Sequence, residues 1–426
     1  MQISTKYRTL VAIIKSSMFN PTTTSETEVL TRTSVVDYKK NQHRRLILSE
    51  LYRSGTASIA ELARIIHSSV PSVTSIVEEL VEEKWIVPVG TGITKQGRKP
   101  VLFSLSSDHF YTLVLDVSTH DTKVLIMNLK NEIVLRRDFN LRLEDSSRFL
   151  NELIEITEQT FEESSIPYSN FIALGVSIAG LIDTSKGYNF TYKNLNSNQH
   201  SFGLILEEHF KIPVHIINDT KATTLGEHRF GLAQGKDHVL AIYIDWGVGL
   251  GIILNGEVFQ GASGFAGELG HIQVVPNGEL CHCGKVGCLD TITSAASLIR
   301  RIKKGLGEGR ISRLSAIEID KIDAETIIDA AWQGDSFAID ILHDIGMELG
   351  KGLSIAIHLF NPEIVIVDGI VAKAGAFITN PIEQAINKYC LTDFRSNLSI
   401  VISQLGQEAK WLGTQAYVVE KAIETN

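Results

Sequence analysis

The sequence predicts an α/β protein in which a winged helix-turn-helix unit precedes a larger body of two lobes. Two observations support this fold class. Residues 39–105 contain three short helical patterns followed by two β-like runs, and from Phe110 onward buried strand-like runs alternate with helix-like segments. A length of 426 residues with 44% hydrophobic content is enough for two or three globular domains. Residues 1–38 lack clean periodicity and are expected to form a flexible or loosely helical arm.

Charge is distributed unevenly along the chain. Residues 1–105 contain 14 Lys/Arg and 9 Asp/Glu, whereas the remaining residues contain 26 and 40, within a net charge of −9. A basic head on an acidic body indicates an anionic partner for the head alone. The longest early apolar run, Leu10–Ile14, is too short for a signal peptide, and no later run is long enough to cross a bilayer. We therefore expect a cytoplasmic, nucleoid-associated protein without membrane insertion.

The head is built from three predicted helices and a hairpin. The first has its apolar stripe at Leu46, Ile47, Leu51 and Tyr52 and ends at Gly55. The second begins at Ser58, where Glu61 completes a capping box. The third begins at Val70-Pro71-Ser72, and two β-runs then flank a Gly-rich basic tip.

This order of elements predicts DNA binding. The N-terminal end of the third helix is expected to enter the major groove, and the hairpin tip to contact phosphates or a narrow minor groove. The residues assigned to DNA contact are Ser69, Ser72 and Thr74 from the helix, and Lys95, Arg98 and Lys99 from the tip. A helical trio is also compatible with a protein-interaction module, but the Gly-Arg-Lys-Pro tip favours DNA.

A cysteine-rich segment of the body predicts a metal site. His271, Cys281, Cys283 and Cys288 provide one imidazole and three thiols, with the cysteines spaced Cys-x-Cys-x4-Cys. This is the donor set of a tetrahedral structural zinc ion, and four protein ligands leave no open position for catalysis. The alternative is a loop of reduced cysteines without metal. With three of four cysteines in one cluster, no disulfide framework is expected.

Several segments together resemble a known family. ELGHIQV, CHCGKVGCLDTITS, IINDTKAT and the GRKPVLF hairpin resemble the ROK family of repressors and sugar kinases over about residues 40–420. The N-terminal winged helix resembles that of the NagC/XylR-type (Mlc-like) transcriptional regulators. The resemblance implies an actin-like (ribonuclease H-like) ATPase fold, with a first lobe over 106–225 completed by a C-terminal helix at 405–426 and a second lobe over 226–404.

The resemblance also implies a sugar site between the lobes. It carries over to Gly180, Asn194, Asn218, Asp219, Glu268, His271 and Asp290. In the family's kinases the residue matching Asp219 accepts the proton of the sugar hydroxyl. Asp290 stands where the family more often has Glu. Taken alone, Asn218-Asp219 is equally typical of a helix cap, and Glu268 of a solvated loop residue.

The loops that would hold ATP phosphates differ from the kinase pattern. After Asp116 the chain reads Val-Ser-Thr-His-Asp-Thr, without the expected Gly-Gly-Thr, and the second loop begins Asp245-Trp246. The strand at Val367-Asp368-Gly369 keeps one glycine where kinases tend to have more. We therefore expect no enzymatic activity.

The sequence as a whole predicts a sugar-responsive transcriptional regulator, most simply a repressor. It would act as a homodimer or homotetramer on a double-stranded DNA operator, with a monosaccharide or sugar phosphate as effector and structural zinc as its only cofactor. Two alternatives remain open. One is an active ROK-type sugar kinase with a DNA-binding head, and the other is a regulator controlled by a protein partner that docks on the body.

Overall fold

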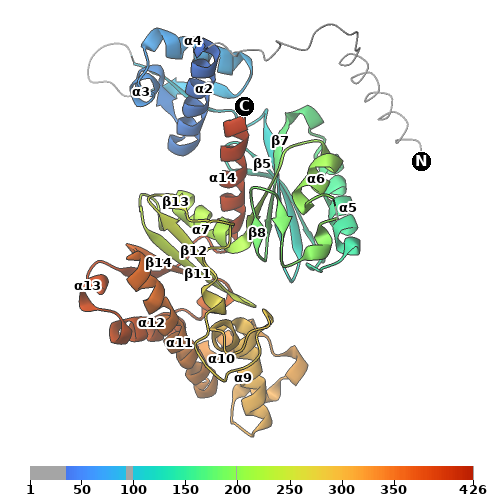
Figure 1. The fold of residues 1–426 in the computed structure, drawn as a ribbon, viewed down its shortest axis with the longest axis vertical. Coiled ribbons are helices and arrows are strands. Elements are labelled where there is room, and N and C mark those ends of the chain that lie inside the picture. Colours follow the sequence, from blue (N-terminus) through green and yellow to red (C-terminus); the bar gives the residue numbers. More distant parts are fainter. Residues whose placement is uncertain (1–34, 93–98, 198, 426) are drawn as a thin grey trace. The chain divides into compact units, whose positions relative to one another are not determined.

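The computed structural model describes residues 35–92, 99–197 and 199–425 (Figure 1). The head begins with α2 (Val35–Ser54), which starts inside the predicted arm, six residues before Asn41. It continues with β1 (Ala57–Ser58), α3 (Ile59–Ile65), α4 (Val70–Glu82), β2 (Ile86–Thr91) and β3 (Val101–Leu105). The strands form one antiparallel sheet in the order β1-β3-β2. Three helices and a hairpin are the winged helix-turn-helix arrangement predicted from the sequence.

Local sequence signals account for these helices. The Ser58 side chain accepts a hydrogen bond from the Glu61 N–H, and the Glu61 carboxylate accepts one from the Ser58 N–H, so the capping box is present. Pro71 occupies the first turn of α4, whose buried face is Val73, Ile76, Val77 and Leu80. The predicted stripe of the first helix needs one correction: Leu46 is exposed and Leu48 is buried instead. The buried face of this helix is therefore shifted by about one residue from the predicted apolar stripe, and the core contains Ile47, Leu48 and Leu51.

The first sheet of the body has the order β10-β7-β4-β5-β6. Its strands are β4 (Tyr111–Val117), β5 (Thr122–Asn128), β6 (Ile133–Phe139), β7 (Phe171–Ile178) and β10 (Val214–Asn218), and its helices are α5 (Ser147–Ser164) and α6 (Phe202–Phe210). β4, β5 and β6 form an antiparallel meander, whereas β7 and β10 pair in parallel beyond β4. Short elements between them are η1 (Tyr168–Asn170), β8 (Ile182–Asp183), β9 (Tyr188–Asn189) and η2 (Lys193–Leu195).

The second sheet repeats this topology in the order β13-β12-β11-β14-β15. Its strands are β11 (Val239–Ile244), β12 (Val248–Leu254), β13 (Glu257–Val258), β14 (Ile364–Asp368) and β15 (Ser399–Ile402). Again three antiparallel strands come first and two parallel strands follow. The repeated pattern matches the two similar lobes predicted from the alternation of strand-like and helix-like segments.

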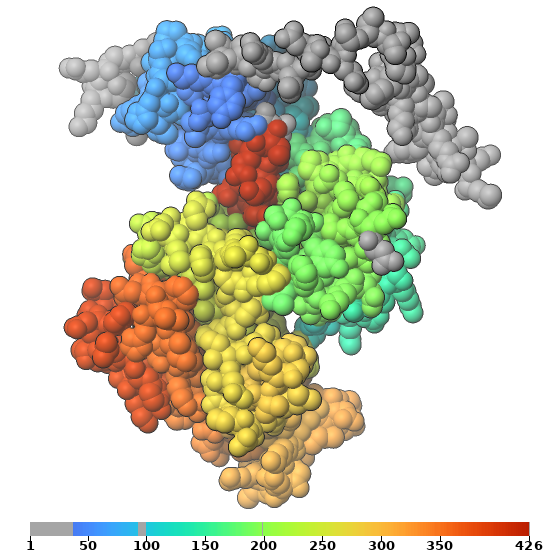
Figure 2. Space-filling view, in the orientation of Figure 1, coloured from blue at the N-terminus to red at the C-terminus, as the bar shows by residue number. Residues whose placement is uncertain are grey.

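Helices between β13 and β15 cover the second lobe. They are η3 (Leu269–His271), α8 (Asp290–Thr293), α9 (Ala295–Gly307), η4 (Arg313–Ala316), η5 (Ile319–Lys321), α10 (Ala324–Trp332), α11 (Ser336–Phe360), η6 (Ile370–Ala374), α12 (Ala376–Tyr389) and α13 (Thr392–Arg395). The side chains of this lobe, coloured from yellow to orange-red, form a continuous surface in Figure 2. Among the described residues, no helix is long and apolar enough to cross a membrane.

Two helices of the body, α7 (Asp219–Phe230) and α14 (Gln407–Thr425), cross each other at close range. Helix α7 follows β10, and α14 also packs on β7 and β4 of the first sheet. A Cβ added at Gly226 would lie 1.8 Å from the Ala409 carbonyl oxygen, and one at Gly413 would lie 1.8 Å from the Ala222 carbonyl oxygen. Glycine is therefore required on both helices for their backbones to approach so closely. This crossing fixes α14 beside the start of α7, where the predicted Asn218-Asp219 pair lies.

Candidate functional site

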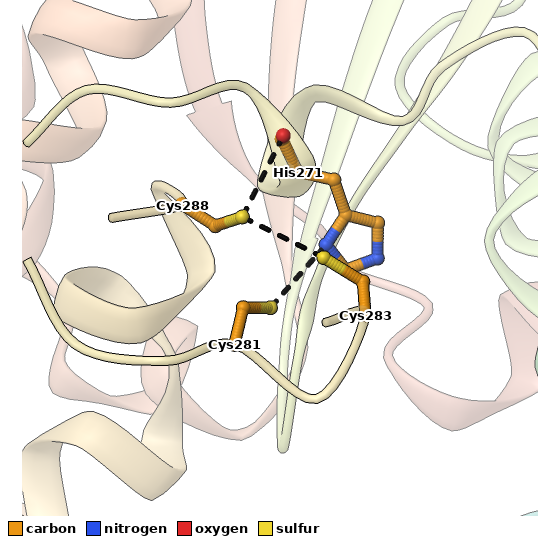
Figure 3. Close-up of side chains that lie close together, drawn as sticks. All are labelled: His271, Cys281, Cys283 and Cys288. Atoms are coloured by element: carbon orange, nitrogen blue, oxygen red, sulfur yellow. Dashed lines mark hydrogen bonds between the residues drawn. The ribbon is translucent and has the colours of Figure 1, made fainter. Parts of the chain in front are cut away.

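The four predicted metal ligands converge in one segment of the second lobe (Figure 3). The ligand atoms of His271, Cys281, Cys283 and Cys288 all lie within 4.8 Å of one another. Cys281 Sγ is 3.7 Å from His271 Nδ1, and Cys283 Sγ is 3.7 Å from Cys288 Sγ. The ligand–ligand edge of a tetrahedron built on zinc–sulfur bonds of about 2.3 Å is about 3.8 Å. The donor set and its spacing therefore fit one tetrahedral metal ion.

Tight backbone turns bring these ligands together. Gly287 has φ +75°, and a Cβ there would lie 1.6 Å from the Val275 carbonyl oxygen. The Cys281 N–H donates to the Lys285 carbonyl at 2.7 Å, which closes the loop that carries Cys283. The cluster is therefore organised by the segment's own backbone, and Gly287 between the cysteines has a steric reason.

His271 connects the cluster to the predicted sugar site. Its Nδ1 faces Cys281, whereas its Nε2 lies 3.8 Å from the Glu268 carboxylate. A carboxylate behind a metal-binding imidazole fixes the orientation of the ring. Burial lowers the pKa of His271, which favours the neutral ring that binds metals, and burial also raises the pKa of Glu268.

His282 is a neighbour of the cluster that sequence reasoning missed. Its Nδ1 lies 3.4 Å from the Asp290 carboxylate, so that His271, Cys281, His282 and Asp290 form a second possible ligand set. Asp290 is only 5% exposed, and its Oδ1 has no hydrogen-bond partner among the described residues. A Cβ at Gly247 would lie 3.6 Å from that oxygen. Asp290 thus presents a buried acceptor to the β11–β12 turn.

Asn218 and Asp219 lie at the junction of β10 and α7. The Asn218 side chain is the N-cap of α7, accepting from the Lys221 N–H at 3.2 Å, and it donates to the Gly180 carbonyl at 3.1 Å. The capping role weighed from the sequence is therefore real, and it also ties Asn218 to Gly180, whose φ is +106°. Asp219 follows, half-buried, and burial raises the pKa of its carboxyl group.

A buried lysine holds the next loop against α7. Lys221 is 4% exposed, and its ammonium group donates to Gln260 Oε1 at 3.2 Å and to the Gly264 carbonyl. This contact places the segment that leads to Glu268 over the start of α7. Burial lowers the pKa of Lys221, whereas the Glu268 charge raises it. Sequence reasoning missed Lys221 because a lysine in the first turn of a helix normally faces solvent.

Asn194 forms hydrogen bonds with Asp145, which is not one of the predicted sugar-site residues. It is exposed in η2, where its N–H donates to Asp145 Oδ1 at 2.7 Å and its amide donates to the Asp145 carbonyl at 3.0 Å. Its side-chain oxygen is left as a possible acceptor. Among the predicted sugar-site residues, Asn218 is therefore hydrogen-bonded to Gly180, and Glu268 lies beside His271. Asn194 is instead hydrogen-bonded to Asp145.

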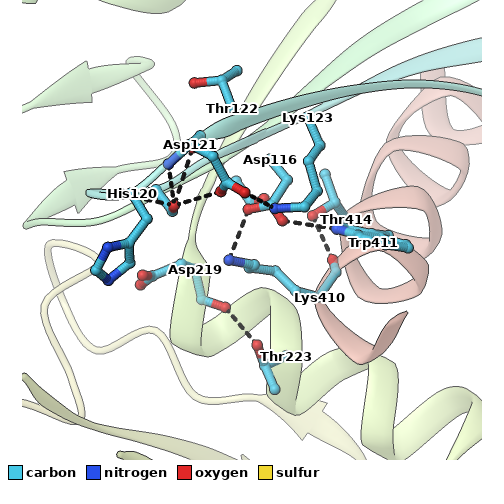
Figure 4. Close-up of polar contacts among 12 residues, drawn as sticks. Asp116, His120, Asp121, Thr122, Lys123, Asp219, Thr223, Lys410, Trp411 and Thr414 are labelled. Carbon is cyan, nitrogen blue, oxygen red and sulfur yellow. Dashed lines mark hydrogen bonds and ion pairs between the residues drawn. The ribbon is translucent and has the colours of Figure 1, made fainter. Parts of the chain in front are cut away.

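The end of β4 is joined to α14 by a buried ion pair (Figure 4). The Lys410 ammonium lies 2.7 Å from Asp116 Oδ1, and the Trp411 indole N–H donates to Asp116 Oδ2 at 2.7 Å. The structure places Asp219 beside them. Lys410 and Trp411 were not predicted as site residues, since nothing in the local sequence of the C-terminal helix connects them to Asp116.

The predicted DNA-contact residues are only partly described. Lys95 and Arg98 lie outside the described residues, while Lys99 is exposed. Ser69 caps α4 by accepting from the Ser72 N–H at 3.4 Å, and the Ser72 side chain is exposed. The Thr74 hydroxyl donates to the Val70 carbonyl at 2.9 Å. Ser69, Ser72 and Lys99 are therefore the exposed candidates for DNA contact among the described residues, and Thr74 is half-buried.

Comparison with known proteins matches two separate parts of the chain to family models. The ROK family model matches residues 112–421, and a winged helix-turn-helix DNA-binding model matches residues 40–87. The chain is 30% identical over 370 residues to the DNA-binding transcriptional dual regulator NagC of Escherichia coli K12, covering 87% of this chain and 90% of that protein. It is 27% identical over 391 residues to the xylose repressor of Bacillus subtilis 168, covering 91% and 97%.

Solved structures share the fold as well. A ROK family transcriptional regulator described as a homologue of the Escherichia coli Mlc protein has a TM-score of 0.78 at 27% identity, covering 91% of this chain and 97% of that one. A ROK family glucokinase from Streptomyces griseus in complex with glucose and AMPPNP has a TM-score of 0.64 at 26% identity, covering 72% and 99%. With its body matched almost end to end and a DNA-binding unit before it, this chain belongs to the ROK family.

Proposed function

We propose that the protein is a sugar-responsive transcriptional regulator that represses carbohydrate-utilisation genes. The observation that carries this proposal is the similarity to repressors across both head and body, over 87% of the chain for NagC and 91% for the xylose repressor. A likeness confined to the body would not distinguish a regulator from a sugar kinase. The presence of the winged helix-turn-helix unit favours a DNA-binding role.

The head supplies the DNA contacts of this proposal. The N-terminus of α4 would enter the major groove, with Ser72 near the base edges, while Lys99 and its neighbours in the hairpin tip would contact phosphates. A homodimer or homotetramer would present two such heads to a pseudo-palindromic operator. An exchange of Lys99 for Ala should then weaken binding to all DNA sequences alike and lower the salt slope of log K by about 1.

The effector would be a monosaccharide or sugar phosphate bound between the lobes. Asp219 and Glu268 offer acceptors for hydroxyl groups, and the unpartnered Oδ1 of Asp290 is a further buried acceptor. Burial raises the pKa of Glu268, and the charge of Asp219 raises it further, which supports placing the two carboxylates near one another. Two neighbouring carboxylates suit a polyol, whose several hydroxyl groups donate hydrogen bonds at fixed spacing.

The metal at the four-ligand cluster would be zinc in a structural role. Its position behind Glu268, through His271, makes it a support for the wall of the sugar site. A bound metal ion would fix the orientation of the His271 ring. Through that ring it would also fix the position of the Glu268 carboxylate that would bind the sugar. Zinc is expected to contribute folding energy rather than chemistry, because four protein ligands fill its coordination sphere.

Contacts of α14 offer a route from this site to the head. Val419 and Ile423 of α14 share a hydrophobic cluster with Ile47, Leu48 and Leu51 of α2. The Tyr52 hydroxyl also donates to Asn131 Oδ1 at 2.7 Å. The other end of α14 carries Lys410 beside Asp219. A change of the cleft on sugar binding would therefore be transmitted by one helix that contacts both places.

The test is a thermal-shift screen of N-acetylglucosamine, xylose, glucose and their phosphates, since a ligand of the native state raises its unfolding midpoint. A sugar that raises the midpoint should also release the protein from operator DNA. An Asp219→Asn variant should lose the shift and keep its DNA affinity. If no sugar binds at millimolar concentration, control by a protein partner is favoured, and steady ADP release from ATP with a hexose would support the kinase alternative.

A further inference from the structure

One buried cation faces the acidic groups of the cleft. Lys410 is 7% exposed, and together with Trp411 it occupies both carboxylate oxygens of Asp116, each at 2.7 Å. A buried lysine is costly unless it is paired, so its position here requires an opposing charge. Burial by itself lowers the pKa of Lys410, but the surrounding carboxylates raise it above its ordinary value, so the ammonium stays charged.

Acidic residues from three strand ends surround this ammonium. Asp116 is in β4, Asp219 follows β10, and Asp368 ends β14. Lys410 lowers the pKa of both Asp219 and Asp368, against the effect of burial. Figure 4 shows the ion pair of the ammonium with Asp116 and places Asp219 nearby. In an open α/β sheet ligands bind outside the carboxyl ends of the strands, which is the edge of the sheet where this cation lies.

Carboxylates arranged in this way normally bind a divalent cation that carries phosphates. Mg²⁺ is typically held by one or two carboxylates together with substrate phosphate oxygens. A side-chain ammonium between the same carboxylates neutralises their charge without leaving a coordination position. The site therefore has the carboxylate ligands of a metal–nucleotide site, and the Lys410 ammonium already supplies the positive charge that a metal ion would bring.

We propose that Lys410 is a specificity-determining residue: its ammonium takes the place of a divalent cation beside Asp116 and near Asp219, and so excludes metal–nucleotide complexes while leaving the proposed sugar site open to a neutral sugar. The proposal rests on the proposed function as a sensor without phosphoryl transfer. It identifies one residue, far from the phosphate loops in sequence, that contributes to the rejection of nucleotide.

The loop after β4 supports the same conclusion independently. The Ser118 hydroxyl oxygen accepts hydrogen bonds from the N–H groups of His120 and Asp121, at 3.1 and 3.2 Å. These two N–H groups therefore form their hydrogen bonds within their own loop. The Asp121 carboxylate pairs with Lys123 at 2.6 Å, so the positive charge of Lys123 is already compensated within this loop. A phosphate group at this loop would therefore lack both the backbone N–H donors and the favourable charge that phosphate binding requires.

The experiment measures Mn²⁺ binding by electron paramagnetic resonance, with and without AMPPNP, for the full chain and for Lys410→Met. The wild type should bind neither Mn²⁺ nor Mn²⁺–AMPPNP at the cleft. Lys410→Met, which keeps an unbranched side chain one atom shorter and removes the charge, should bind Mn²⁺ at least tenfold more tightly, equivalent to about 1.4 kcal/mol. To keep the cysteine cluster from contributing, the protein is first loaded with Zn²⁺.

Two further variants are the controls. Lys421→Met removes a lysine of the same helix that pairs with Glu424 near its end, and it should leave Mn²⁺ binding unchanged. The double variant Asp116→Asn/Lys410→Met should not bind Mn²⁺, and its unfolding midpoint should exceed that of Lys410→Met alone, because the buried charge of Asp116 that lost its partner is also removed. This comparison of midpoints remains informative if Lys410→Met folds poorly.

The proposal is overturned if the wild type binds Mn²⁺–AMPPNP at the cleft, if a folded Lys410→Met gains no affinity, or if the double variant is no more stable than Lys410→Met. These results are separate from those of the sugar screen. A protein that binds no sugar but gains a Mn²⁺ site on loss of Lys410 would contradict the proposed function and leave the role of Lys410 intact.

Discussion

Cys283 is the exposed member of the four-ligand cluster, while Cys281 and Cys288 are buried. Replacing it with Ser removes one thiolate ligand, because a serine hydroxyl stays protonated and binds zinc poorly. We expect Cys283→Ser to lose most of its zinc to a chelator that leaves the wild type loaded, and to unfold at lower temperature, as measured by colorimetric zinc release and calorimetry.

The fourth cysteine provides the matched control. Cys390 ends α12 and is buried away from the cluster. Cys390→Ser should keep one zinc per chain even if it costs some stability. Full zinc retention by Cys283→Ser would show that the neighbouring His282 and Asp290 can replace the missing thiolate, in line with the second ligand set.

Asp368 gives the molecule a defined pH dependence. Burial raises the pKa of Asp368 to about 6 in the folded protein, above its ordinary value of 3.8. The folded state therefore holds this proton more tightly than the unfolded state, so the stabilisation is present below about pH 4 and is lost as the pH rises to about 6. At about 1.4 kcal/mol per unit, the loss is about 3 kcal/mol.

Asp368→Asn should remove this pH-dependent loss. Urea unfolding across pH 4–8 should show the variant gaining stability relative to the wild type as the pH rises, by up to about 3 kcal/mol. Its side-chain oxygen can still accept the Gly369 N–H, as the Asp368 carboxylate does. Asp340→Asn on the exposed face of α11 is the control. Parallel pH profiles for wild type and Asp368→Asn would rule out this carboxyl group as the cause.

At the scale of elements, the crossing of α7 and α14 is the most constrained contact. An Ala at Gly226 would bring a methyl group against the Ala409 carbonyl, so the helices would have to separate. We expect Gly226→Ala to lower the free energy of unfolding by about 1–3 kcal/mol, the usual cost of overpacking. Because α14 also carries Lys410, the variant should weaken sugar binding as well.

Gly307→Ala is the appropriate comparison for this variant. Gly307 is the last residue of α9, and an added Cβ there meets no atom within 4 Å. Alanine is favoured over glycine in helices, so stability should be unchanged or slightly higher in urea titrations. Equal effects of the two substitutions would mean that helix propensity, and not the crossing, determines the result.

The elements themselves differ in how far sequence predicted them. Ser58 and Glu61, three residues apart, correctly marked the start of α3, and Pro71 marked α4, because caps depend on neighbouring residues. The start of α2 was predicted too late and its stripe was misplaced at Leu46, because tertiary packing decides which face of a helix is buried.

At the scale of the whole molecule, a regulator of this kind couples two binding events. If a sugar lowers operator affinity by a coupling free energy of about 1–3 kcal/mol, operator DNA must lower sugar affinity by the same factor of about 5–150. We expect titrations of sugar with and without operator, and of operator with and without sugar, to give one coupling constant. Affinities that do not depend on the other ligand would contradict sugar control.

The sequence alone determined the parts of this protein that depend on short spacing. The ligands His271, Cys281, Cys283 and Cys288 lie within one segment, so their convergence was predictable from their order and chemistry. The tertiary structure alone decided the charge balance of the cleft. Asp116 and Trp411 are 295 residues apart, and their contact, like that of Asp116 with Lys410, exists because α14 returns to the first sheet beside α7. Residues that meet only through chain folding leave no local pattern, and the cation that faces Asp219 is one of them.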